Sequence, residues 1–179
     1  MAFDLPPVRM GLYAVLGFFS FLLFCLSAAR LGYTTNLPEG DPLNGGRNFY
    51  DPIVVELLFT TLMTMPWCGY VTYCIYKRFE ARYLSTFRDE LIMLVVLWFF
   101  WIIGAAIASS IWGDLTWCSQ FNACRVLSAL EAFAWLGWIA LTMLVIVSAL
   151  FGFANKAFLE PLHGRWDPRA SIYNPSSKV

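Results

Sequence analysis

The sequence predicts an all-α membrane protein, a four-transmembrane helix bundle with both termini cytosolic. Of 179 residues, 59% are hydrophobic and 13% are charged, against roughly 45–50% and about 25% in soluble domains. The mean hydropathy is +0.62, and aromatic residues make up 18% of the chain. These values argue against a soluble enzyme. Twelve basic and twelve acidic side chains cancel, so no nucleic-acid partner is expected.

Four uncharged runs carry this prediction, at residues 10–29, 57–76, 91–113 and 132–155. A hydrocarbon core of ~30 Å needs about 20 apolar residues in a helix. We predict spans at about 10–30, 53–76, 91–113 and 127–154. The first run exceeds the core of a signal peptide and precedes no convincing cleavage site, so we expect a retained helix. Residues 1–8 then form a cytosolic N-terminus, 9–155 the four-span domain, and 156–179 a cytosolic tail.

The orientation follows from the basic residues beside each span. Nine lysines and arginines lie in the N-terminal segment, the 77–90 loop and the tail, against three beside the other two loops. Because cytosolic loops are enriched in Lys and Arg, both termini and the middle loop are predicted to lie in the cytosol.

The five cysteines divide by predicted compartment. Cys118 and Cys124 share an outer loop, where oxidation is permitted. We expect a disulfide that pins this loop, the alternative being two free thiols. Cys25 and Cys68 fit as apolar packing residues. Cys74, near the inner face, is a candidate for S-palmitoylation, with ordinary packing as the alternative.

Two acidic residues, Glu56 and Glu131, lie near the outer ends of the second and fourth predicted helices. An acidic side chain at the bilayer centre costs ~2.5–3.5 kcal/mol on insertion scales. One interpretation is a proton or cation relay between these helices. The other is a pair of carboxylates that reach the interface or pair with Arg30 or Arg125.

Pro66 lies near the middle of the second span. A proline inside a helix removes one hydrogen bond and here frees the carbonyl of Leu62, which predicts a helix kink. Thr60, Thr61 and Thr64 are close enough to satisfy freed backbone groups.

Small and aromatic residues recur at helical spacing in the third and fourth spans. Trp98 and Trp101 share a face near mid-membrane, and small residues continue it. Small residues allow close helix approach. One interpretation is packing within the bundle, and the other is a flat aromatic surface that selects rigid lipids such as sterols. The candidate helix-packing residues are Gly104, Ala108, Trp135 and Trp138.

Two short patterns also indicate sterol contact. Residues 71–77, centred on Tyr73 and ending at Lys77, fit a proposed sterol pattern, and residues 9–15, centred on Tyr13, fit its reverse. Such patterns are hypothesis-grade, because any Tyr-rich helix that ends in a base produces them. The candidate lipid or sterol contacts are Tyr13, Tyr73, Lys77, Trp98 and Trp101.

Catalytic and cofactor motifs are missing from the sequence. The one histidine, His163, lies in the tail, and there is no C-x-x-C pair, G-x-G-x-x-G, Walker motif or G-x-S-x-G. We therefore expect no catalytic residues, no cofactor and no metal.

Four spans, inward termini, short outer loops and a cysteine pair in the second loop resemble the MARVEL domain, particularly its fungal members. The likeness is carried by the run WCSQFNACR at 117–125, followed by Ala129, Phe133, Trp135 and Trp138, and it extends over residues 8–155. The long tails and long outer loops of occludin-like members are missing, which puts a junctional role in doubt.

The resemblance implies a non-enzymatic organiser of sterol-rich membrane domains or an adaptor in vesicle trafficking. Its partners would be membrane lipids, including sterol, and a second copy or another membrane protein bound through the third helix. The plasma membrane is the expected location, with secretory or endosomal vesicles as the alternative. The competing function is a small ion or proton channel or transporter, or its accessory subunit, that uses Glu56 and Glu131.

Overall fold

The computed structural model describes residues 5–39, 43–77, 86–113, 118 and 120–155. It contains four long helices, α1 (Leu5–Thr35), α2 (Pro52–Lys77), α3 (Phe87–Ile111) and α4 (Asn122–Asn155), and a short 3-10 helix, η1 (Leu43–Gly46). The described residues form no strand. The predicted all-α four-helix fold is confirmed.

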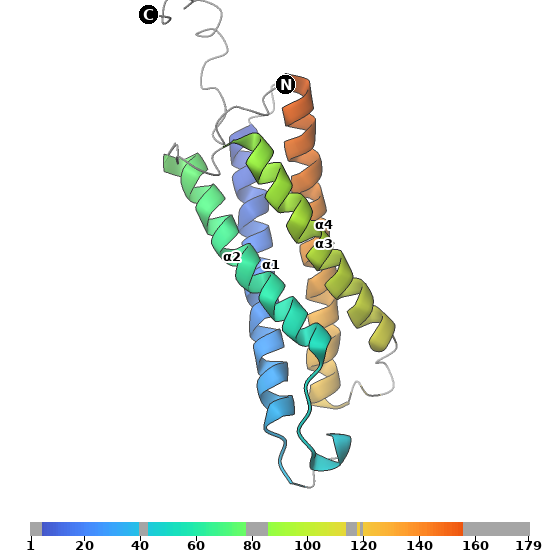
Figure 1. The fold of residues 1–179 in the computed structure, drawn as a ribbon. Coiled ribbons are helices and arrows are strands. Elements are labelled where there is room, and N and C mark those ends of the chain that lie inside the picture. The colour runs from blue at the N-terminus through green and yellow to red at the C-terminus, as the bar shows by residue number, and fades with distance from the viewer. Residues whose placement is uncertain (1–4, 40–42, 78–85, 114–117, 119, 156–179) are drawn as a thin grey trace, which may run out of the picture.

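The helices form an up-and-down bundle (Figure 1). Helix α1 packs against α2 and α4, and α3 packs against the same two helices. Helix α1 therefore lies diagonally opposite α3, and α2 opposite α4. One end of the bundle, here called the terminal end, holds the start of α1, the end of α2, the start of α3 and the end of α4. The opposite end, where η1 also lies, is here called the loop end.

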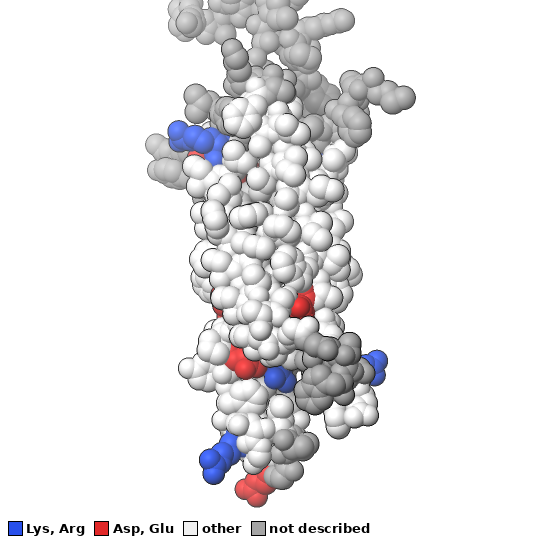
Figure 2. All heavy atoms as spheres, turned by 90° about the vertical axis from the view of Figure 1, so that its right-hand side faces the viewer, with Lys and Arg blue, Asp and Glu red and all other residues white. Residues whose placement is uncertain are grey.

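All four helices are long and apolar enough to cross a membrane. Figure 2 shows a band without charged side chains across one face, bounded by Lys and Arg toward one end and by acidic and then basic side chains toward the other. Large apolar side chains such as Phe18, Phe99 and Ile103 are exposed along the helices. Such side chains would be costly in water but suit hydrocarbon. The chain is therefore an integral membrane protein.

All four helices begin before the predicted spans, and three of them do so by a full turn or more, at Leu5, Phe87 and Asn122. At α3 the reason is a helix cap: the hydroxyl of Thr86 accepts a hydrogen bond from the Asp89 backbone N–H at 3.3 Å. Such a cap satisfies an orphan donor of the first turn. As a result, Glu90 belongs to a helix and not to the preceding loop.

Two glycines, Gly137 and Gly104, allow neighbouring helices to pack closely in the bundle core. A Cβ atom added at Gly137 would overlap the ring of Trp101, and one added at Gly104 would overlap Leu57 and the carboxylate of Glu56. Glycine therefore lets α4 approach the Trp101 ring and lets α3 approach α2.

Candidate functional site

An open groove lies between α1 and α2 and is here called the α1–α2 groove. Its volume is about 470 Å³, and its lining includes the small residues Ala14, Gly17 and Gly69. Nothing lies within 4 Å of a Cβ atom built at Gly69, so this glycine leaves open space. The groove offers a smooth apolar surface to a ligand from the membrane.

Tyrosines border the α1–α2 groove. Tyr73 is 53% exposed, and Tyr76 is exposed with the Lys77 Nζ atom 5.4 Å from its ring centroid. Thr72, Tyr73 and Tyr76 belong to the last turns of α2, which lie toward the terminal end. The structure therefore brings an exposed aromatic residue and a base of the first sterol pattern to one site.

Tyr13 lies beneath this groove and has no exposed surface. Its hydroxyl donates to Glu90 Oε1 at 2.5 Å, which holds the ring inside the bundle. Tyr13 therefore has no exposed surface for surrounding lipid, and its contact with a ligand in the groove stays a prediction.

A buried polar cluster joins three helices near the terminal end. The carboxylate of Glu90, on α3, accepts hydrogen bonds from Arg9 and Tyr13 of α1 and from Ser148 of α4. Arg9 is 2% exposed and Glu90 is 0% exposed. The Arg9 guanidinium also lies 4.4 Å from the centroid of the Phe87 ring. This cluster links α1 to the diagonally opposite α3.

The uncharged runs in the sequence do not predict this cluster. Arg9 and Glu90 each stand one residue outside an uncharged run, and so they marked the ends of the predicted spans. One signal could have revealed them: opposite charges flank the first and third runs at the same predicted membrane face. Such a pair can enter the bundle together, since each charge compensates the other.

The tryptophan face of α3 is internal. Trp101 has no exposed surface, and its indole N–H donates to Thr64 at 3.1 Å. Trp98 is half-buried, donates to Thr142 at 2.9 Å and packs against Trp138. The prediction that Trp101 contacts lipid is therefore wrong, and the packing interpretation describes both residues.

The same result affects the expected partner surface on α3. Gly104 and Ala108, which continue the tryptophan face, are also buried within the bundle. The indole N–H of Trp135 donates to Ser109 at 2.9 Å and so ties α4 to α3. These two residues therefore pack inside the bundle, and binding of a partner through the third helix stays a prediction.

The two acidic residues are separated by the bundle geometry. Glu56 and Glu131 lie on α2 and α4, which are diagonally opposite, and both are half-buried. Glu56 Oε1 accepts from Thr60 at 2.9 Å, while its buried Oε2 has no hydrogen-bond partner among the described residues. Arg30 pairs with Asp51 at 3.4 Å and not with either glutamate.

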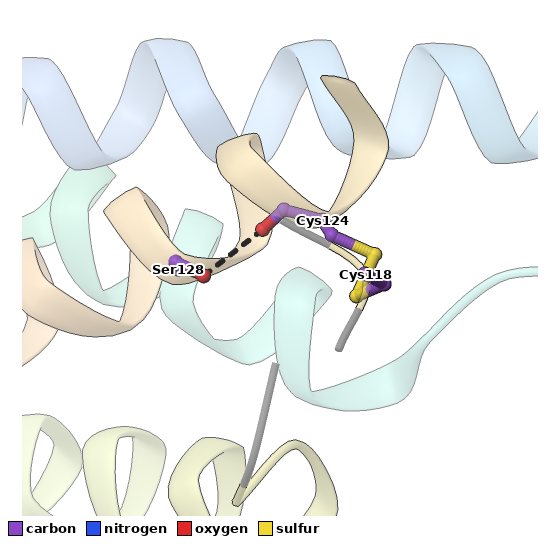
Figure 3. Close-up of a disulfide and its surroundings, with 3 residues drawn as sticks. All are labelled: Cys118, Cys124 and Ser128. Atoms are coloured by element: carbon purple, nitrogen blue, oxygen red, sulfur yellow. Dashed lines mark hydrogen bonds between the residues drawn. A yellow bond between two sulfur atoms is a disulfide. The ribbon is translucent and has the colours of Figure 1, made fainter. Parts of the chain in front are cut away.

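The cysteines fall into two groups. Cys118 and Cys124 form a disulfide at the start of α4, and the hydroxyl of Ser128 donates to the Cys124 carbonyl at 3.1 Å (Figure 3). The expected pairing is therefore present. Cys74 has no exposed surface. Because its thiol faces the bundle interior, the palmitoylation hypothesis is wrong for the folded protein.

Helix α2 continues through Pro66. The hydroxyls of Thr61 and Thr64 donate to the carbonyls of Leu58 and Thr60, so these two threonines bond to their own preceding turn. The kink stays a prediction.

Within the part of the chain that the structure describes, no three His, Cys, Asp or Glu side chains form a metal-binding group. His163 and the tail at 156–179 lie outside the described residues, as do residues 1–4 and 78–85.

Comparison of the chain with family models, with curated proteins and with solved structures gives no match in any of the three.

Proposed function

We propose that this protein organises sterol-rich membrane, acting through lipid contacts and not through catalysis. The observation that carries the proposal is the α1–α2 groove, where small residues meet exposed tyrosines. The ligand we propose for the groove is a sterol.

The chemistry of the groove supports a sterol in particular. A rigid, flat ring system needs a smooth apolar surface, which Ala14, Gly17 and Gly69 provide. The single hydroxyl of a sterol needs a polar partner near the membrane interface, where Tyr and Lys anchors are usual. Thr72 and Tyr73 supply hydroxyls in the last turns of α2, and Lys77 ends the helix.

The resemblance to the MARVEL domain supports the broader role. On this proposal the protein resides in the plasma membrane with both termini in the cytosol, and it sorts other membrane proteins or takes part in vesicle trafficking. Lateral partners would meet the exposed apolar side chains of the helices, since the small-residue face of α3 is occupied within the bundle.

Filling the groove tests the proposal. Gly69→Leu places a side chain in open space without touching the core, so we expect crosslinking of a photoactivatable sterol to the purified protein to fall about tenfold, the effect of ~1.4 kcal/mol. Gly32→Leu is the matched control, because Gly32 also has nothing within 4 Å and lies outside the groove. Equal crosslinking of the two variants would rule out this groove as the sterol site.

A second candidate function, ion or proton transport, is favoured by one observation: the Oε2 atom of Glu56 is buried without a hydrogen-bond partner among the described residues. Because Glu56 and Glu131 occupy diagonally opposite helices, we expect the wild type to conduct no more protons or cations in proteoliposomes than empty vesicles do. Glu56→Gln and Glu131→Gln should then leave this flux unchanged. Flux through the wild type that both variants abolish would replace the organiser proposal with transport.

A further inference from the structure

A second hollow lies at the loop end, between the end of α1, η1 and the start of α4; it is here called the loop-end hollow. Its volume is about 650 Å³, within the range of pockets that hold small ligands. Its walls are mostly apolar, with Ala29, Leu43, Phe121 and Val126 among them, and the Cys118–Cys124 disulfide forms part of one side.

Arg30 is the one charged side chain among the described residues that line this hollow. It is 7% exposed, and its Nε atom has no hydrogen-bond partner in the described part of the chain. The ion pair with Asp51, at 3.4 Å, is long, and the guanidinium lies 5.9 Å from the Phe49 ring centroid. A buried guanidinium with an unused Nε–H donor is costly unless an acceptor satisfies it.

We propose that the loop-end hollow binds an acidic phospholipid from the adjacent leaflet. The phosphate would accept hydrogen bonds from Arg30, and an acyl chain would follow the apolar wall near Ala29 and Val126. The planar fork of an arginine matches phosphate oxygens. Arg30 belongs to the last two turns of α1, where a spanning helix reaches the lipid headgroups.

Two observations favour an acidic lipid over other ligands. The apolar walls favour a ligand with a hydrocarbon chain over a soluble anion. The described lining contains no acidic side chain that could attract the choline or ethanolamine group of a zwitterionic lipid. This site is separate from the α1–α2 groove, so it does not depend on the sterol proposal.

The test uses the full chain reconstituted in phosphatidylcholine vesicles, with spin-labelled phosphatidylglycerol as the probe. For the wild type we expect a larger motionally restricted fraction for this probe than for spin-labelled phosphatidylcholine. Arg30→Gln should lower the relative association about fivefold, the scale of one basic residue near anionic lipid. Arg125→Gln is the control, because Arg125 is exposed near the same end and does not line the hollow.

Two further variants keep the proposal testable if Arg30→Gln does not fold. Val126→Trp fills the hollow while Arg30 and Asp51 remain, and it should reduce probe association. Asp51→Asn releases Arg30 from its ion pair and should increase it. The proposal is overturned if the wild type restricts the two lipid probes equally. It is also overturned if the probe binds to both variants, Val126→Trp and Asp51→Asn, as it binds to the wild type. Displacement of the probe by millimolar inorganic phosphate would also overturn it, in favour of a free-anion site.

Discussion

Replacement of Glu90 by alanine is expected to destabilise the bundle by about 3–5 kcal/mol, because it leaves the buried Arg9 guanidinium without its counter-charge. The hydroxyls of Tyr13 and Ser148 lose their acceptor at the same time. The free energy of unfolding would be measured by titrating SDS into mixed micelles and following helix content. Arg88→Ala is the matched control: its side chain is 64% exposed and two positions away, so its effect should stay within about 0.5 kcal/mol.

A combined variant separates the effect of losing the buried charges from the effect of losing side-chain volume. Arg9→Met, Tyr13→Phe and Glu90→Leu together remove both charges and one hydroxyl while keeping apolar volume. Replacing a whole buried ion pair by apolar residues is often neutral, so the triple variant should recover most of the stability that Glu90→Ala loses. A Glu90→Ala protein as stable as Arg88→Ala would show that the cluster contributes nothing to the fold.

This cluster also shows where sequence reasoning stopped. The uncharged runs predict four helices because a bilayer core requires that length of apolar chain. The same rule places helix ends at the first charge, and so it predicts Arg9 and Glu90 as flanking residues. In the structure they lie inside α1 and α3 because each satisfies the other. A boundary rule based on single charges cannot find a compensated pair.

The rotation of each helix was harder to predict than its position. In a soluble bundle, polar residues mark the solvent face of a helix. Here the outward faces carry residues such as Phe99 and Ile103, which are as apolar as the core. Spacing therefore placed Trp98 and Trp101 on one face, but it could not tell whether that face met lipid or the bundle interior. The burial of Trp101 and Cys74, where spacing alone left an inward and an outward position open, has this cause.

The second large effect is expected at Trp101. Trp101→Ala should destabilise the bundle by about 3–5 kcal/mol, the range for deleting a large buried aromatic side chain. The ring fills the space beside Gly137, and its N–H is the partner of the Thr64 hydroxyl. Phe99→Ala is the control, because that side chain is 54% exposed on the same helix and its removal leaves Trp101 in place, although the edge contact with the Trp98 ring is lost. Unfolding in SDS again measures both.

The Trp101–Gly137 contact predicts coupling between the two positions. In the wild-type background, Gly137→Ala forces a methyl group into the Trp101 ring, and overpacking of this kind costs about 1–3 kcal/mol. In a Trp101→Ala background the same methyl group enters vacated space, so Gly137→Ala should be neutral or stabilising there. The double-mutant cycle should therefore show an interaction energy of about 1–3 kcal/mol. If the two effects simply add, the ring does not occupy the space above Gly137, and the close approach of α4 to Trp101 must have another basis.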